Sequence, residues 1–180
     1  NNQVVVGMVA LFRERKGVEV LLNSLKGVKN IKCRLIGQFE STQYENKIKK
    51  LVEELKLKDT VCFTGFIEDM QKEYQKINIL ALPSLFGEGV PMVALEAMSY
   101  GIPVVGTDVE GVPELIDSEN IGLICEPANS EDFRKKLTYL VENKNRIYQI
   151  GESALNHQQK KFSDISMCNK IEEVYLDLLN

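Results

Sequence analysis

Two glutamates lie in one segment that contains glycines and a proline and runs from Ser84 to Met98. Glu88 stands between two glycines, where the backbone can approach a ligand closely and the carboxylate can face a cleft. Glutamates in loops are more often simply solvated, so Glu88 taken alone favours an exposed acid over a functional one.

Pro91 fits the first position of a helix, where its missing N–H costs nothing. The amides of Met92, Val93 and Ala94 would then point out of the helix start without backbone acceptors. A diphosphate would satisfy them, because a helix start attracts anions. The sequence therefore predicts a phosphate site next to Glu88.

Glu96 would lie in the second turn of the same helix. It is the only charge in the apolar run from Gly89 to Val105, so we expect a buried carboxylate that needs partners. The two vicinal hydroxyls of a ribose would supply two donors. An arginine or backbone amides would serve a purely structural carboxylate equally well, so Glu96 taken alone leaves both readings open.

Short β-branched runs alternate with helical patterns, which specifies an α/β fold with a doubly wound parallel sheet of about six strands. The predicted strands are Val4 to Val9, Cys33 to Gly37, Val61 to Gly65, Ile79 to Pro83, Pro103 to Thr107 and Gly122 to Cys125. Ser41 is predicted to cap one helix. Three helices follow from Ser130 onward, and the last carries an apolar stripe that needs a cover, formed by Ile171, Val174, Tyr175 and Leu178.

Ligands of such sheets bind outside the carboxyl ends of the strands, so the loops after the strands position the candidate residues. One of these loops, with the helix and strand that follow it, strongly resembles the signature of retaining GT-B glycosyltransferases of the family-4 type, also called glycosyl transferases group 1. It reads FGEGVPMVALEAMSYGIPVVGTDVEGVPELI. Similarity extends from Val4 to about Leu179, and it includes Val6 to Ala10, Lys16-Gly17, Leu35 to Gly37 and Phe162-Ser163. The resemblance implies the Rossmann-like C-terminal half of a GT-B fold.

The resemblance implies a role for several residues. Glu96 would bind the donor ribose, and Glu88 would lie beside the transferred sugar as a catalytic group. Amides of the helix start would contact sugar or phosphate, and the backbone after the third strand would meet the base, although side chains there fit a plain core role equally well. These donor-binding positions are Gly89, Val90, Met92, Val93, Phe66 and Ile67.

The family also places an arginine five or six residues before a lysine, and both cations neutralise the leaving diphosphate. Lys16 matches the lysine, whereas Leu11 and Ala10 occupy the arginine positions. Arg13 or Arg15 could substitute from the same loop, or Lys16 could act alone; Arg13 is the better candidate, and solvated charges are the alternative for both. A second departure is Glu110-Gly111, where the family often has two glycines.

The composition argues against several classes of protein. The chain has 180 residues and a net charge of -4 without a basic block, which predicts a single domain, residues 1–180, without a nucleic-acid footprint. Cys33, Cys62 and Cys125 fall in apolar runs and Cys168 stands alone, so we expect core thiols in a cytoplasmic protein. No Asp-x-Asp motif occurs and His157 is the sole histidine, expected to pack in a late helix, so we expect neither a metal nor another cofactor.

The start at Asn1-Asn2-Gln3 resembles neither a signal peptide nor an initiator, so we expect a longer protein whose N-terminal acceptor-binding domain is missing here. The expected function is to hold a nucleotide-sugar whose sugar is transferred to an acceptor, and this chain alone should be inactive. Peripheral membrane attachment of the full-length protein stays open. The alternatives are a non-catalytic Rossmann-like nucleotide- or phosphate-binding module and a GT-B sugar-nucleotide epimerase.

Overall fold

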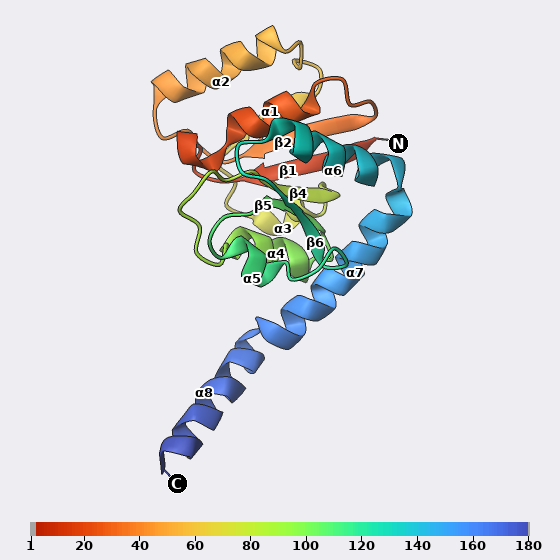
Figure 1. The fold of residues 1–180 in the computed structure, drawn as a ribbon. Coiled ribbons are helices and arrows are strands. Elements are labelled where there is room, and N and C mark those ends of the chain that lie inside the picture. The colour runs from red at the N-terminus through yellow and green to blue at the C-terminus, as the bar shows by residue number, and fades with distance from the viewer. Residues whose placement is uncertain (1–2, 180) are drawn as a thin grey trace.

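A six-stranded parallel sheet forms the centre of the molecule, and Figure 1 shows helices on both of its faces. The computed structural model describes residues 3–179. The predicted chain start at Asn1-Asn2 and the last residue of the predicted domain lie outside this range. The strands are β1 (Val4–Val9), β2 (Ile31–Ile36), β3 (Val61–Gly65), β4 (Ile79–Leu82), β5 (Val104–Thr107) and β6 (Gly122–Cys125).

The strand order is β3-β2-β1-β4-β5-β6, and every neighbouring pair is parallel. All six predicted strands are confirmed, with ends displaced by at most two residues. The central strands β4 and β5 are buried at every position, as expected for strands covered on both faces. This order is that of a doubly wound Rossmann-like sheet, which confirms the predicted fold class.

The helices divide into two layers. They are α1 (Val18–Leu25), α2 (Thr42–Glu54), α3 (Met70–Tyr74), α4 (Met92–Ser99), α5 (Val112–Leu115), α6 (Ser130–Glu142), α7 (Lys144–Lys161) and α8 (Asp164–Leu179). One core cluster joins the sheet to α1, α2 and α6, and a second joins it to α3, α4 and α5. Each face of the sheet therefore has its own apolar core.

Local sequence accounts for the helix starts. Ser41 caps α2 as predicted, because its hydroxyl accepts the Tyr44 amide at 3.2 Å. The cap of α6 is Asn129, one residue before the predicted start at Ser130; its side chain accepts the amides of Glu131 and Asp132.

The cysteines occupy two environments, and all four are free thiols. Cys33 and Cys125 are buried, and burial raises the pKa of each to about 12. Cys62 and Cys168 are exposed, so the expectation of core thiols is wrong for both. Cys62 lies on β3, an edge strand that partly faces solvent, and Cys168 lies on α8, where no residue is buried.

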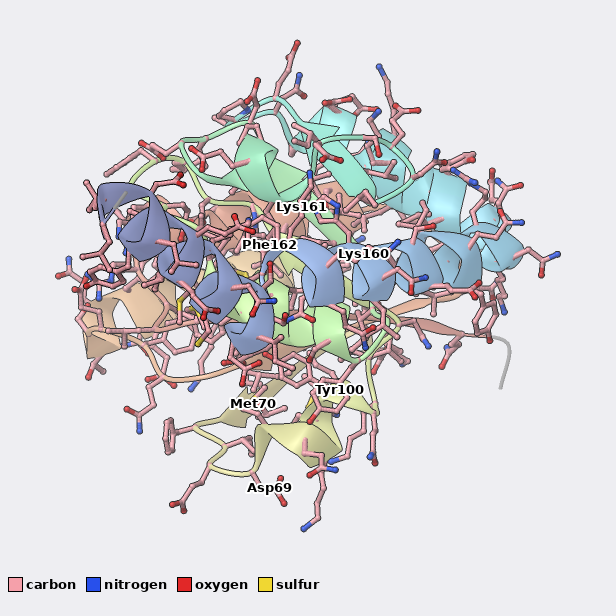
Figure 2. The ribbon with its side chains drawn as sticks, turned by 90° about the horizontal axis from the view of Figure 1, so that it is seen from below. Asp69, Met70, Tyr100, Lys160, Lys161 and Phe162 are labelled. Carbon is pink, nitrogen blue, oxygen red and sulfur yellow. The ribbon has the colours of Figure 1, made fainter. Side chains whose placement is uncertain are left out.

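Helix α7 runs along the edge of the domain and packs against α4, while α8 continues away from the body (Figure 1). Figure 2, seen from below, shows Phe162 where α7 gives way to α8. No residue of α8 is buried, and Leu178 is 77% exposed. The predicted apolar stripe is therefore uncovered in this chain. Within residues 3–179 no helix is long and apolar enough to cross a membrane.

Candidate functional site

The candidate site lies where β1 and β4 run side by side at the centre of the sheet. The chain leaves β1 for α1 on one face and leaves β4 for α4 on the other. The strand order reverses at this point, and ligands of such sheets bind there, in the crevice outside the carboxyl ends of the strands. The loop after β1 carries Lys16, and the loop after β4 carries Glu88.

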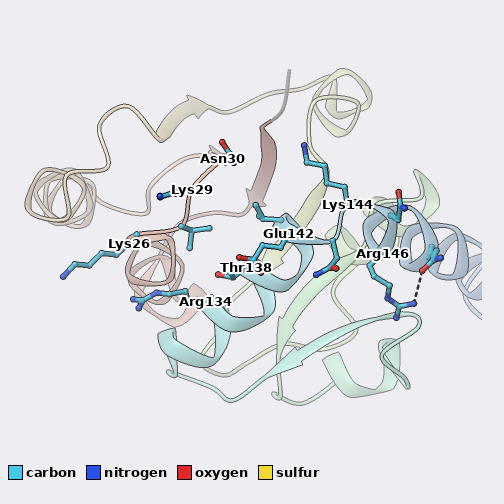
Figure 3. Close-up of a pocket in the computed structure, with 14 residues that line it drawn as sticks. Lys26, Lys29, Asn30, Arg134, Thr138, Glu142, Lys144 and Arg146 are labelled. Atoms are coloured by element: carbon cyan, nitrogen blue, oxygen red, sulfur yellow. Dashed lines mark hydrogen bonds between the residues drawn. The ribbon is translucent and has the colours of Figure 1, made fainter.

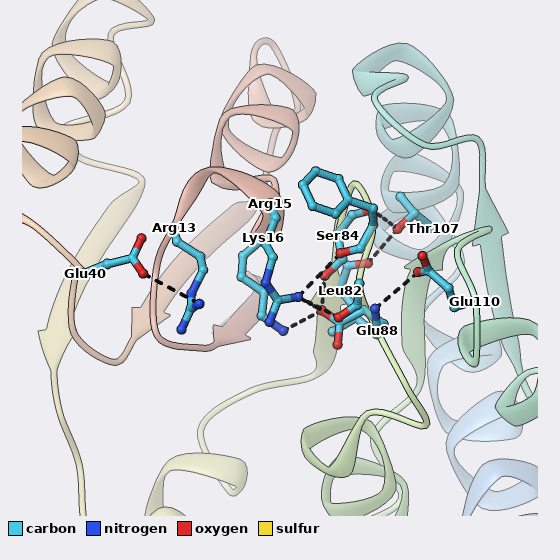
Figure 4. Close-up of polar contacts among 11 residues, drawn as sticks. Arg13, Arg15, Lys16, Glu40, Leu82, Ser84, Glu88, Thr107 and Glu110 are labelled. Carbon is cyan, nitrogen blue, oxygen red and sulfur yellow. Dashed lines mark hydrogen bonds and ion pairs between the residues drawn. The ribbon is translucent and has the colours of Figure 1, made fainter.

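Glu88 is buried, with 7% of its surface exposed. Its Oε1 accepts from the Ser84 hydroxyl at 2.6 Å and from the Lys16 ammonium, and Arg15 Nη1 lies 3.7 Å from the same oxygen (Figure 4). A buried carboxylate persists only when paired and hydrogen-bonded in this way. The expectation of a solvated loop acid, favoured for Glu88 alone, is therefore wrong.

The two oxygens of Glu88 differ. Among residues 3–179 no protein donor contacts Oε2, and this oxygen is not among the buried side-chain atoms that lack a partner. Oε2 therefore reaches solvent, while Oε1 is held by the protein. One oxygen fixes the side chain and the other is available to a ligand.

Gly17 brings Lys16 to this carboxylate. Lys16 ends a short 3-10 turn, Glu14–Lys16, and Gly17 follows in the left-handed conformation with φ 69°. A Cβ on Gly17 would lie 1.9 Å from the Pro83 carbonyl oxygen, so only glycine lets the β1 loop approach the end of β4. The Leu85 amide also donates to the Arg15 carbonyl at 2.8 Å.

The two candidate arginines point to different partners. Arg13 pairs with Glu40 at 3.6 Å, so the structure does not bring it to Glu88. Arg15 instead donates to the Gly87 carbonyl at 2.7 Å (Figure 4). Arg13 precedes the 3-10 turn Glu14–Lys16 in an extended conformation, whereas Arg15 and Lys16 lie within the turn and both reach the loop after β4.

The start of α4 offers free amides beside Glu88. Pro91 precedes the helix in an extended conformation, one position before the predicted one. Within the described residues the amides of Met92 and Val93 have no protein acceptor, and the first turn carries no acid. The Ala94 amide donates to the Pro91 carbonyl at 2.9 Å, so the expectation that it is free is wrong.

A mostly apolar pocket of about 430 Å³ lies next to this helix start. Four predicted donor-binding residues line it: Phe66, Ile67, Val93 and Glu96. Phe66 is 68% exposed, so its side chain does not belong to the core. The pocket has the size and apolar lining of a small-ligand site with few polar groups.

Glu96 is exposed, so the expectation of a buried carboxylate is wrong. Its position on α4 faces the pocket mouth, although its neighbours Ala97 and Met98 are buried. The Tyr74 hydroxyl donates to Glu96 Oε2 at 2.7 Å. Burial, and the adjacent Glu96, raise the pKa of Tyr74, which keeps the phenol protonated as a donor. Tyr74 thereby orients Glu96 toward the pocket.

Three residues of this arrangement were not predicted as parts of a site. Ser84 and Tyr74 hold the two glutamates, and the Glu110 carboxylate accepts the Glu88 amide at 3.2 Å. Ser84 could have been predicted as a site residue from the sequence, because it is a hydroxyl two residues after a buried central strand. Tyr74 lies 22 residues before its partner and has no local signal.

A larger pocket of about 1040 Å³ lies elsewhere, near the ends of α1 and α6 and the start of α7 (Figure 3). It lies before β2, at the amino ends of the strands, and no predicted site residue lines it. Its two arginines are already engaged: Arg134 donates to the carbonyls of Asn23 and Ser24, and Arg146 to Gln149 and Asn120. The apolar pocket at Glu96, next to the helix start beside Glu88, is therefore the better candidate despite its smaller volume.

The sequence profile of glycosyl transferases group 1 matches residues 1–157. The chain belongs to this family. Among curated members similar to it are an uncharacterized glycosyltransferase of Haemophilus influenzae, 29% identical over 85% of this chain and 43% of that protein, and the N-acetyl-alpha-D-glucosaminyl L-malate synthase of Bacillus anthracis, 27% identical over 95% of this chain and 45% of that protein. The chain thus spans about half the length of the glycosyl transferases group 1 relatives it matches.

Solved structures confirm the fold as that of the C-terminal domain of GT-B glycosyltransferases. Anabaena HepE in complex with UDP matches with a TM-score of 0.92 at 23% identity, covering 98% of this chain and 49% of that one. The C-terminal domain of LpcC, a glycosyl transferase group 1 family protein of Francisella tularensis, matches with a TM-score of 0.80 at 24% identity and is itself covered to 87%.

Proposed function

We propose that this chain binds the nucleoside-diphosphate sugar of a retaining glycosyltransferase. The observation that carries the proposal is the arrangement around Glu88. A buried carboxylate keeps one oxygen on Lys16 and Ser84 and turns the other to solvent, beside a helix start with free amides. These groups match the sugar and the diphosphate of such a donor.

Two relatives support this ligand class. HepE was crystallised with UDP and with UDP-glucose, and the B. anthracis relative is an N-acetyl-alpha-D-glucosaminyl L-malate synthase. The alternatives of a phosphate-binding module without chemistry and of an epimerase have no comparable observation in their favour.

In this proposal the donor lies across the crevice. The base and ribose occupy the pocket at Phe66 and Ile67, where Glu96 accepts hydrogen bonds from ribose hydroxyls. The diphosphate meets the amides of Met92 and Val93 at the start of α4, whose dipole favours an anion. The backbone of Gly89 and Val90, both exposed, would flank the sugar.

The chemistry follows from these charges. The bond between the anomeric carbon and the diphosphate oxygen breaks, and its electron pair leaves with the nucleoside diphosphate. A nucleophilic atom of the acceptor forms the new bond to that carbon on the same face and gives its proton to the leaving diphosphate. Lys16 and the helix start would stabilise this growing negative charge, which is work that a divalent ion performs in other enzymes. Glu88 Oε2 would stabilise the positive charge that develops on the sugar. We propose that no metal takes part.

Transfer would require a second, acceptor-binding domain. The exposed apolar stripe of α8 supports this, because a soluble surface does not normally present such a stripe. The relatives support it too, since the match covers only 43% of the length of the H. influenzae protein. We propose that the chain alone binds donor without turnover. Its four free thiols favour a cytoplasmic setting.

Calorimetric titration with UDP, GDP and ADP tests the proposal. We expect one of them to bind clearly better than the others. Glu96→Ala should weaken binding of the ribonucleotide by roughly tenfold or more, because the ribose hydroxyls lose the carboxylate that accepts their hydrogen bonds. It should weaken binding of the 2′-deoxynucleotide less. Lys16→Ala should weaken the diphosphate more than the nucleoside.

Arg13→Ala is the matched control, because Arg13 lies in the same loop but pairs with Glu40. It should leave diphosphate affinity nearly unchanged. Absence of binding to all three nucleotides would refute the proposed function, and equal effects of Glu96→Ala on ribo- and deoxyribonucleotides would refute the ribose site. Binding unchanged by EDTA is expected; its loss would refute metal independence.

A further inference from the structure

The backbone that carries Glu88 is held from the β1 side by Arg15. Its Nη1 donates to the Gly87 carbonyl at 2.7 Å and lies 3.4 Å from the Phe86 carbonyl. The same atom is 3.7 Å from Glu88 Oε1. One guanidinium nitrogen thus contacts two successive peptide groups and the carboxylate that follows them.

The loop after β5 holds the same backbone from the other side. The Glu110 carboxylate accepts the Glu88 amide at 3.2 Å, and the Gly111 amide donates to the Glu88 carbonyl at 3.2 Å. The backbone amides of Gly87 and Glu88, with Arg15 nearby, hold the pKa of Glu110 below its usual range. The bond therefore persists at neutral pH.

The two loops meet without room for adjustment. A Cβ on Gly111 would lie 2.6 Å from the Gly89 carbonyl carbon, so residue 111 must be glycine for this approach. Gly87 and Gly89 on either side of Glu88 would otherwise let the loop take many conformations. Contacts to the loop backbone must therefore select one conformation, and Arg15 and Glu110 make such contacts.

We propose that Arg15 and Glu110 are positioning residues, a clamp that sets where Glu88 Oε2 points. This inference rests on the proposed function, because it concerns how that site grips the sugar of its donor. It also explains the departure at residue 110: a carboxylate there supplies an acceptor to the Glu88 amide that glycine could not.

The clamp should matter for ligand recognition more than for folding. Glu110 is exposed and Arg15 is partly exposed, and interactions of exposed groups contribute little to stability. A change in sugar recognition with an unchanged melting temperature would therefore mark a positioning role.

The test uses the nucleoside diphosphate that binds best and its conjugates with glucose, galactose, mannose and N-acetylglucosamine. The conjugate whose affinity falls most in Glu88→Ala is the probe. For this probe we compare Glu110→Ala, Glu110→Gln, Arg15→Ala and the control Arg13→Ala. The readout is the ratio of the dissociation constants of the free diphosphate and the sugar conjugate, together with the melting temperature.

We expect Glu110→Ala to lower this ratio roughly fivefold to tenfold, which is less than loss of a direct hydrogen bond to a charged group would give, because Glu110 acts on the sugar only through Glu88. Glu110→Gln should restore most of it, because the amide oxygen still accepts the Glu88 amide. Arg15→Ala should lower the ratio and Arg13→Ala should not. In a Glu88→Ala background, Glu110→Ala should have no further effect, because the clamp acts through Glu88.

Distinct results separate the two hypotheses. No nucleotide binding by the unaltered chain overturns both. A probe sensitive to Glu88→Ala but not to Glu110→Ala overturns the clamp alone, and so does an effect of Glu110→Ala that persists without Glu88. A series in which no conjugate responds to Glu88→Ala removes the role of Glu88 and overturns the clamp with it.

Discussion

Replacing Lys16 with methionine would leave the buried carboxylate of Glu88 with two partners instead of three. Glu88 is 7% exposed and the Lys16 side chain 17% exposed, so water can replace the lost ammonium only in part. Removing one partner of a buried ion pair costs about 3–5 kcal/mol when the other charge is left uncompensated. That range is the upper limit for Lys16→Met.

The remaining contacts reduce this cost. Arg15 lies 3.7 Å from Glu88 Oε1, which at an effective dielectric constant of about 20 corresponds to roughly 4.5 kcal/mol of gross attraction before desolvation. Ser84 still donates at 2.6 Å. We therefore expect Lys16→Met to lower the free energy of unfolding by about 2 kcal/mol, below the range for an uncompensated charge.

A double-mutant cycle isolates the pair. Urea unfolding followed by circular dichroism would be measured for the unaltered chain, Lys16→Met, Glu88→Gln and the double variant. We expect a coupling energy of about 1–2 kcal/mol, because Lys16→Met should cost much less once residue 88 is neutral. The coupling should survive 1 M KCl, since buried pairs are screened little.

The exposed pair of Lys50 and Glu54, at 3.6 Å on α2, is the matched control. Its coupling should be small and should vanish in salt, because both side chains are largely in water. If Lys16→Met cost the same with glutamate or glutamine at position 88, the ion pair that anchors the proposed site would not exist in solution.

Two further variants test the packing of α7 and of the loop after β1. Burial lowers the pKa of His157, outweighing the nearby Asp117, so the unfolded chain takes up a proton near pH 6.5 that the folded chain does not. The free energy of unfolding should therefore fall as the pH drops from 7 toward 5, and less so in His157→Gln; equal slopes in acid titrations of both would contradict this. Gly17→Ala should destabilise the chain by about 2–4 kcal/mol in urea unfolding, because it adds a clash with the Pro83 carbonyl to backbone strain. Gly27→Ala, with φ +80° and open space around its Cβ, is the control that carries the strain alone, and an equal cost of both changes would rule out the close approach.

The fold was predictable because its signals are local. Runs such as Val4 to Val9 and Gly122 to Cys125 combine β-branched residues with flanking turns, and these properties lie within one short window. The same holds for the start of α4, where Pro91 marks the end of the loop. Lys16 and Glu88 came from the family signature, which is also a property of sequence.

The environments of these residues were decided by the tertiary structure. Sequence alone favoured burial for Glu96 and exposure for Glu88, and the structure reverses both. An apolar run predicts that a helix is buried, but it does not say which side of the helix borders a pocket. Glu88 is buried because Lys16, 72 residues earlier, closes over it.

The choice between Arg13 and Arg15 was likewise decided by the tertiary structure. The two arginines are two residues apart in one loop, and only the fold directs one to Glu40 and the other to Gly87. Glu110 reaches Glu88 across 22 residues because β4 and β5 are neighbours in the sheet. The sequence by itself determined the strands, the helix start and the chemical types of the site residues. The pairing of those residues was decided by strand order, since contacts between distant loops exist only once the sheet has formed.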